Sequence, residues 1–271
     1  MALAVTILHD SFGPPGPLVK NWGFAALAEL DGRRILFDTG NDADVFRSNV
    51  EAMGVELGRL DLVVISHRHG DHTTGLAYVL EKSPRVAVHV PKETYGVFGS
   101  SLPGTFYPRC PTLPLERRYY DGFPPELIRH GTPWRGADFR PVGETTELLP
   151  GVVAVHTISE VAGTREMPEL SLSLATSAGQ VLISGCSHCG IEKIVEAAPA
   201  SNGPVRCIMG GLHLVVAPVP EIERVAASLR DRLGVESVAP GHCTGEPGFD
   251  VLQRAFGKRY RYAGLGERLT F

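Results

Sequence analysis

Four candidate metal ligands lie close together in the first third of the chain. The heptapeptide Ser-His-Arg-His-Gly-Asp-His carries His67, His69, Asp71 and His72. Imidazole and carboxylate are usual ligands of zinc and related divalent ions, and one ion needs three or four of them. The motif therefore predicts a divalent-metal site. A metal-free, histidine-rich surface loop is the alternative, but the apolar run at 62–65 just before the motif reads as a buried strand.

Three further histidines each follow an expected strand and have glycine nearby: His188, His213 and His242. The expected strands cover residues 181–184, 205–209 and 235–239. Strand ends at one edge of a layered α/β fold are where sites are built, and glycine lets a turn approach a ligand closely. We therefore expect these histidines near the first motif. The other four lack this setting and are interpreted as core or surface residues: His9, His89, His130 and His156.

These motifs need a scaffold, and the hydrophobic pattern supplies one. Further strands are expected at residues 2–8, 24–30, 33–37, 86–90, 152–156 and 170–176, and helices at 41–53, 73–82, 191–198 and 220–233. The pair Asp31-Gly32 between two strands is a hairpin signal. Strands in two groups, each with helices, indicate two sheets packed face to face with helices outside. An open doubly wound sheet is the alternative.

The segment at about 95–143 differs from the rest of the chain. It is rich in proline and aromatic residues and shows neither helical nor strand periodicity. A long irregular segment within a compact domain is usually a lid or a binding loop, and the aromatic content favours an ordered lid over disorder. The segment also carries five arginines, which either form a solvated face or receive an anionic substrate group. They are Arg117, Arg118, Arg129, Arg135 and Arg140.

Composition bounds the remaining choices. Of 271 residues, 43% are hydrophobic and 21% charged, which suits a globular protein with a substantial core. A net charge of -4 gives no basic footprint for nucleic acid, and no apolar run approaches the ~20 residues that span a bilayer. Five cysteines without a framework spacing, and an N-terminus without signal-peptide features, predict a reducing, cytoplasmic setting. The oligomeric state stays open.

The motifs together resemble the metallo-β-lactamase superfamily. The resemblance rests on Asp38-Thr39-Gly40, on the heptapeptide with its His-x-His-x-Asp-His run, and on Gly241-His242. Four stretches are similar to a branch labelled dihydropterin-methyl-ribofuranosylaminobenzene-phosphate synthase-like, whose members are mostly called metal-dependent hydrolases. These stretches are residues 36–40, 184–188, 210–213 and 239–245.

The resemblance implies one domain over residues 1–271, a four-layer αββα sandwich with a metal site at its open edge. It implies one or two divalent ions, zinc first, with manganese or iron as alternatives. His67 and His69 would serve the first ion. Asp71 and His72 would serve the second, with His242 completing it.

The sequence departs from the superfamily pattern at Cys186, where most members have a metal-bridging aspartate. His188, two residues on, is the expected substitute ligand. The usual third-motif histidine is not evident either, because His156 and Glu169 lie in the right stretch without the expected neighbours. Cys186 and Cys189 also have redox-motif spacing, so redox catalysis, a role at the metal and plain packing are all open for these thiols.

Asp38-Thr39-Gly40 also matches the aspartic protease triplet. That chemistry needs two such aspartates sharing a proton, and the chain contains one copy. Asp38 is instead expected to hydrogen-bond the metal-site loop.

The predicted activity is hydrolysis of an ester, lactone, amide or phosphoester of a small molecule by metal-activated water. Asp71 would orient the water or take its proton. His213 would stabilise the developing oxyanion or the leaving group, unless it is itself a ligand. Two alternatives stand: a pterin-related transferase using the metal as a Lewis acid, and a non-catalytic metal-dependent ligand-binding protein.

Overall fold

The computed structural model describes residues 2–93, 97–129 and 132–271. Tyr95, at the expected start of the proline-rich segment, and His130 lie outside these residues.

Two large sheets form the centre of the molecule. In order, the first contains β15 (Arg268–Thr270), β1 (Leu3–His9), β2 (Ala25–Leu30), β3 (Arg33–Phe37), β4 (Leu62–Val64), β5 (Ala87–Pro91) and β8 (Asp138–Val142). The second contains β14 (Ser237–Gly241), β13 (Val205–Gly211), β12 (Gly179–Ser184), β11 (Pro168–Thr176), β10 (Val152–Ile158) and β9 (Thr146–Leu149). Their facing sides share one buried apolar cluster, so the sheets pack against each other.

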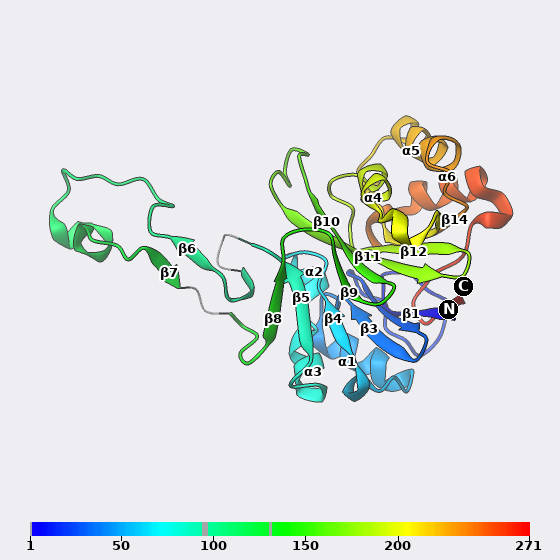
Figure 1. Cartoon of the computed structure of the whole chain (residues 1–271), viewed down its shortest axis with the longest axis horizontal. Helices are drawn as coiled ribbons and strands as arrows, with labels where there is room; N and C mark the ends of the chain where they lie inside the picture. Colours follow the sequence, from blue (N-terminus) through cyan, green and yellow to red (C-terminus); the bar gives the residue numbers. More distant parts are fainter. Residues whose placement is uncertain (1, 94–96, 130–131) are drawn as a thin grey trace.

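Helices cover the two outer faces. The described helices are α1 (Ala43–Ala52), α2 (Gly70–Thr73), α3 (Leu76–Lys82), α4 (Ile191–Ala197), α5 (Val219–Ala227) and α6 (Glu246–Phe256). A second apolar cluster joins α4, α5 and α6 to the second sheet, and a third joins α1 and α3 to the first. Figure 1 shows the resulting layers, with α4 to α6 on one side and α1 and α3 on the other. The expected four-layer αββα sandwich is confirmed. None of the described helices is long and apolar enough to cross a bilayer.

Turn chemistry sets the strand register at the start of the chain. Leu30 pairs with Arg33, so only Asp31 and Gly32 connect β2 to β3. Both have positive φ, at 48° and 83°, as a two-residue hairpin turn requires. The predicted hairpin is confirmed.

Strand direction explains where a site can form. β3, β4 and β5 run parallel in the first sheet, as do β12, β13 and β14 in the second. Parallel neighbours bring their carboxyl ends to one edge of a sheet. The loops that follow these strands carry the candidate ligands.

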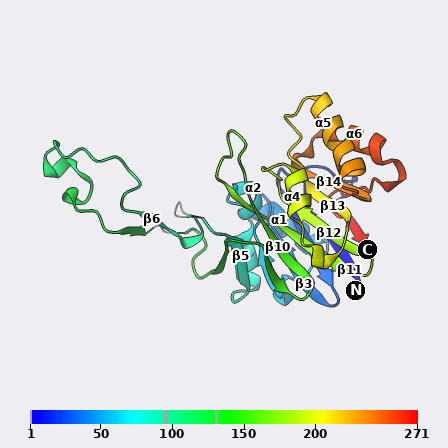
Figure 2. The same cartoon turned by 45° about the horizontal axis from the view of Figure 1, so that its top comes forward.

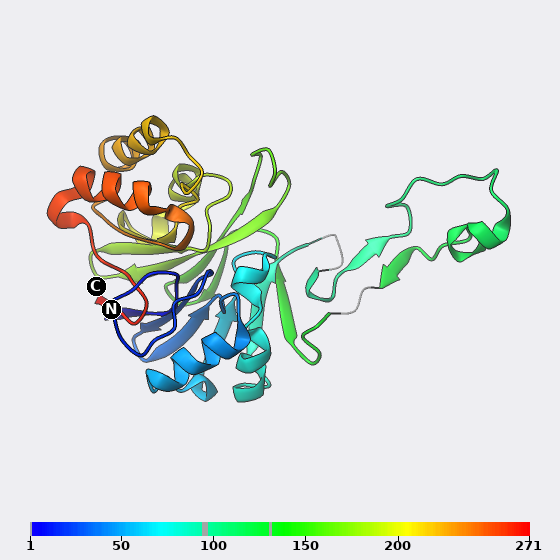
Figure 3. The same cartoon turned by 180° about the vertical axis from the view of Figure 1, so that it is seen from behind.

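The proline-rich segment is not uniformly irregular. Its last part, β8, pairs with β5 and forms an edge of the first sheet. The part of the segment before β8 contains the antiparallel pair β6 (Ser101–Pro103) and β7 (Leu127–Arg129). We call residues 101–129 the arm. Figures 1, 2 and 3 show that the arm extends away from the sandwich.

Several elements depart from the sequence expectations. Outside the arm, three strands and one α-helix were not predicted: β8, β9, β15 and α6. The strand expected at 205–209, β13, extends to Gly211. The helix expected at 73–82 is two helices, α2 and α3. The helix expected at 220–233 is α5 followed by a wider π turn at Ser228–Arg232.

Candidate metal centre

The strand-end loops bring the expected histidines together in two groups. The first donor group contains His67 and His69, after β4, and His188, after β12. The second donor group contains Asp71 and His72, on α2, and His242, after β14. Within each group the ligand atoms all lie within 4.8 Å of one another. Residues from both sheets therefore converge, as the sequence led us to expect.

The first donor group is compact and mostly buried. His67 Nε2 lies 3.1 Å from His69 Nδ1, and the His188 ring centroid lies 4.7 Å from that of His67. Burial, with the neighbouring imidazoles of His72 and His188, lowers the pKa of His67 well below its ordinary value. His67 is therefore a neutral imidazole with a lone pair to offer.

The second donor group surrounds the carboxylate of Asp71. Asp71 Oδ2 lies 3.4 Å from His242 Nε2 and 3.7 Å from His72 Nε2. Although burial opposes ionisation, the His242 imidazole, 3.4 Å away, and the charge of His72 hold the pKa of Asp71 below its ordinary value. Asp71 is thus a carboxylate anion at neutral pH.

Asp38 orients one histidine of each group. Its Oδ1 accepts from the Ser66 backbone N–H at 2.6 Å, and its Oδ2 accepts from the Ser66 hydroxyl and from His72 Nδ1, both at 2.7 Å. The Ser66 hydroxyl donates to Asp38, so Ser66 Oγ accepts from His67 Nδ1 at 2.8 Å. In both His67 and His72 the proton is held on Nδ1 and Nε2 faces the other ligands, the usual arrangement behind metal-bound histidine. The role expected for Asp38 is confirmed.

The pKa of His72 reflects the same contact. Burial lowers it, but the Asp38 carboxylate more than compensates and raises the pKa to about 8. Without metal, His72 therefore carries a second proton at neutral pH, and a metal ion must displace it.

Glu169 fixes the loop that carries His188. It lies on β11, which runs antiparallel to β12, so the start of β11 lies beside the end of β12. Its carboxylate accepts three backbone N–H groups, from Cys186 at 3.3 Å, Ser187 at 3.0 Å and His188 at 2.8 Å. Glu169 thus supports the loop and lies 3.4 Å from His188 Nδ1. His156, the other residue of that stretch, belongs to neither donor group.

The side chains fit a divalent ion. Both ring nitrogens of His242 and the Nδ1 of His188 are buried without a hydrogen-bond partner, a state that costs stability unless something else binds them. A tetrahedral zinc ion at ~2.05 Å separates two ligand nitrogens by about 3.3 Å. The 3.1 Å between His67 Nε2 and His69 Nδ1 is close to that value.

Two cysteines, Cys186 and Cys243, lie next to the two donor groups. Cys186 Sγ is 3.3 Å from His72 Nε2 and is grouped with His67 and His72 as well. Cys243 Sγ is 3.4 Å from Cys186 Sγ. His213 forms a further group with these two thiols, and its ring centroid lies 4.5 Å from that of His188. Cys189, the other half of the Cys-x-x-Cys spacing, lies outside these groups.

Two residues that hydrogen-bond members of the second donor group were not predicted from the sequence. Trp22 follows β1, and its indole N–H donates to Asp71 Oδ2 at 2.9 Å. Asp10 is buried and accepts the His242 backbone N–H at 3.0 Å. Burial raises the pKa of Asp10 to about 8 despite that bond. Trp22 and Asp10 each stand alone in a loop, without the regular spacing to other polar residues that would have identified them from the sequence.

The remaining candidates lie elsewhere. His89 is on β5 and His9 is buried at the end of β1, with Nε2 3.2 Å from the Trp22 carbonyl oxygen. Neither belongs to a donor group. Arg140 pairs with Asp138 on β8, and Arg117 and Arg118 lie on the arm. These three arginines of the proline-rich segment are therefore not gathered at the donor groups.

Residues 23–242 match the sequence model of the Metallo-beta-lactamase superfamily. The 7,8-dihydropterin-6-methyl-4-(beta-D-ribofuranosyl)-aminobenzene-5'-phosphate synthase of Methanocaldococcus jannaschii is 24% identical, over 98% of this chain and 95% of its own.

Solved structures extend the comparison. The crystal structure of a metal-dependent hydrolase of the beta-lactamase superfamily is 26% identical, with a TM-score of 0.72 and 98% of both chains covered. A diphosphatase of the PhnP family is 16% identical with a TM-score of 0.56, covering 100% of this chain and 98% of its own. This second likeness concerns the fold alone.

The geometry separates the roles of His188 and Cys186. Replacing His188 by alanine removes one of three donors from the first donor group, whereas Cys186→Ala leaves all three. Loss of a direct ligand should cost several kcal/mol, against about 1–3 kcal/mol or less for a lost hydrogen bond. Zinc titration against a chelating dye should therefore show a weaker first equivalent in His188→Ala than in Cys186→Ala. His89→Ala serves as the control. A first equivalent lost from Cys186→Ala and kept by His188→Ala would show that the thiolate is the ligand.

Proposed function

The chain belongs to the metallo-beta-lactamase superfamily, and from that premise we propose that it is a hydrolase acting through metal-activated water on an ester, lactone, amide or phosphoester of a small molecule. The observation that carries the proposal is the pair of donor groups, with Asp71 at the boundary with solvent: its side chain is 19% exposed, while those of His72 and His242 are fully buried. The full-length likeness to a protein described as a metal-dependent hydrolase supports it.

We propose zinc as the resident ion, because imidazole, carboxylate and thiol donors together favour it over harder ions. Manganese and iron are the alternatives. His67, His69 and His188 would hold one ion, and Asp71, His72 and His242 a second. When bound, such an ion lowers the pKa of water toward neutrality and polarises the oxygen of the bond under attack.

The protein's own groups then position the reaction. Asp71 orients the attacking water or takes its proton, and the Trp22 indole N–H fixes its Oδ2. His213 is half-buried beside His188 and stabilises the developing negative charge or the leaving group. An imidazole that binds an ion through one nitrogen keeps an N–H on the other, so ligation of His213 would not remove this role.

A transferase is the second candidate, favoured by the likeness to the Methanocaldococcus jannaschii synthase over 98% of this chain. In that case the metal acts as a Lewis acid while a pterin-type group is joined to an aromatic amine. The same donor groups would serve it, so only the substrates distinguish the two reactions.

We further propose that the protein works in the cytoplasm, since all five cysteines are free. We propose a small-molecule substrate and not a nucleic acid, since the net charge is -4.

Activity measurements test the hydrolase. The metal-loaded protein should turn over at least one class in a panel of chromogenic carboxylic esters, phosphate esters, a lactone and an amide. Removing the metal should abolish turnover and restoring zinc should recover it. Asp71→Asn should lower kcat by about 10²–10⁴-fold, because the proton acceptor is lost. Asp61→Asn, at an exposed carboxylate just before β4, should not.

Three results would count against the hydrolase. Turnover that survives metal removal or Asp71→Asn would exclude the mechanism. Product formed only from a pterin compound and an aromatic amine would favour the transferase. Retained metal without either activity would leave a non-catalytic ligand-binding protein.

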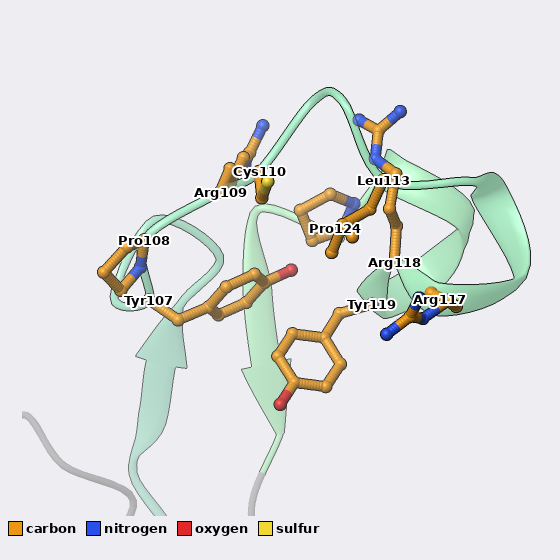
Figure 4. A pocket seen from close by; sticks show the side chains of 10 residues that line it. Tyr107, Pro108, Arg109, Cys110, Leu113, Arg117, Arg118, Tyr119 and Pro124 are labelled. Carbon is orange, nitrogen blue, oxygen red and sulfur yellow. The ribbon is translucent and has the colours of Figure 1, made fainter.

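We also propose that the proline-rich segment, residues 95–143, works as a lid over the site. The arm carries a cavity of about 190 Å³ lined by Arg109, Arg117 and Arg118 together with Tyr107 and Tyr119 (Figure 4). Arginine suits anionic groups, so an anionic substrate could meet this surface. No residue of the two donor groups lines the cavity, so the arm must move to act on the site.

Limited trypsin digestion tests the lid. With inorganic phosphate as the probe, cleavage after Arg117 and Arg118 should be slower than without it, because a lid that closes on an anion protects these bonds. Cleavage after exposed Arg259, far along the chain from the arm, gives the internal control. Equal rates on the arm with and without phosphate would mean that the segment is a rigid insert.

A further inference from the structure

Two thiols from different strand-end loops meet beside the donor groups. Cys186 follows β12 and Cys243 follows β14, and their Sγ atoms lie 3.4 Å apart. Both side chains are buried, at 3% and 2% exposure, and neither is in a disulfide. The Cys-x-x-Cys spacing pointed instead to Cys189, so the partner of Cys186 comes from a loop 57 residues further on.

His213 supplies a third donor to this pair. Its ligand atom lies within 4.8 Å of both sulfur atoms, and its Nδ1 is buried without a hydrogen-bond partner. A tetrahedral zinc ion with Zn–S distances of about 2.3 Å holds two sulfur atoms about 3.8 Å apart. The observed 3.4 Å needs only a small outward shift of one thiol.

The backbone is held in unusual conformations to bring these groups together. Ser187, His213 and His242 all have positive φ, at 63°, 51° and 46°. Non-glycine residues persist in this conformation only where their surroundings determine it, typically at functional sites. Gly211 is packed against both loops, because a Cβ there would lie 2.1 Å from the Gly185 carbonyl oxygen and 2.8 Å from Cys243 Sγ. A side chain at position 211 would displace the thiol.

We propose that Cys186, Cys243 and His213 form a metal-binding group of their own, the thiol group, which holds a thiophilic divalent ion through two thiolates and one imidazole. Soft sulfur donors select zinc and similar ions over magnesium or calcium. Each thiol loses its proton when it binds the ion, so the two sulfur ligands together release two protons to solvent. Cys186 Sγ also lies 3.3 Å from His72 Nε2, so its thiolate can connect the thiol group to the second donor group.

Cobalt(II) reports directly on thiolate ligation, because each sulfur–cobalt bond contributes to a charge-transfer absorption in the near ultraviolet. The test uses the full chain with Cys110→Ser and Cys189→Ser, which removes the two thiols that are not fully buried. In this background, metal-free protein titrated with cobalt should develop the band. Cys186→Ser and Cys243→Ser should each lower it to about half, and the double variant should abolish it. Cys207→Ser, at a buried thiol in the core on β13, is the matched control and should leave it unchanged.

Two further readouts keep the result interpretable. The visible cobalt bands of the histidine ligands should persist in the cysteine variants, which would show that these proteins are folded and still bind metal. His213→Ala should keep the thiolate band but shift its appearance to higher cobalt concentration.

A full band in Cys243→Ser, or none in the starting background, would overturn the proposal and make the thiol pair a packing contact. Because the readout is ligation, its failure is separate from a failure to find hydrolysis.

Discussion

One buried carboxylate, that of Asp38, links the two halves of the metal centre. Through the Ser66 hydroxyl it fixes the proton of His67, and directly it fixes that of His72, so one histidine in each donor group presents Nε2 to the ligand position. Asp38 has positive φ, 59°, which turns the chain at the end of β3, and its backbone N–H donates to the Val64 carbonyl on β4. Side chain and backbone thus tie two adjacent parallel strands to the ligand loop that follows the second. Because Asp38 and Ser66 are wholly buried, loss of either bond would leave polar atoms without water to replace it.

The ligand loops that follow strands of the second sheet are held in place by other carboxyl groups. Glu169, on β11, accepts three backbone N–H groups of the Cys186–His188 loop, and Asp10, which follows β1 of the first sheet, accepts that of His242. Two carboxyl groups therefore hold the loops that carry His188 and His242, while that of Asp38 orients the loop that carries His67 and His72. The sheets pack through a continuous apolar cluster, which keeps these loops at a fixed separation. Ligands from loops more than a hundred residues apart, such as His67 and His188, can then meet within a few ångströms.

Much of this could be read from the sequence. Imidazoles spaced two and three residues apart after an apolar run identify a ligand loop, and period-two and period-three-to-four patterns identify most strands and helices. The αββα layering came from those patterns together with the family resemblance. The helix α6 was missed although Val251, Leu252 and Phe256 form an apolar face and Pro247 marks its first turn. What local patterns do not contain is the contact between distant loops. The pairing of Cys186 with Cys243, and the bond from Trp22 to Asp71, depend on how the sheets stack.

The central claim is that these loops form a metal centre organised by Asp38. Elemental analysis of protein expressed with supplemented metal and then dialysed tests it most directly, on the wild type and on Asp38→Asn. Asparagine tolerates the left-handed backbone, so this variant keeps the turn but loses the acceptor that orients His67 and His72. The wild type should carry at least one equivalent of zinc, manganese or iron, and Asp38→Asn should retain clearly less. A wild type without bound metal would contradict the account, and equal metal in both proteins would contradict the role of Asp38.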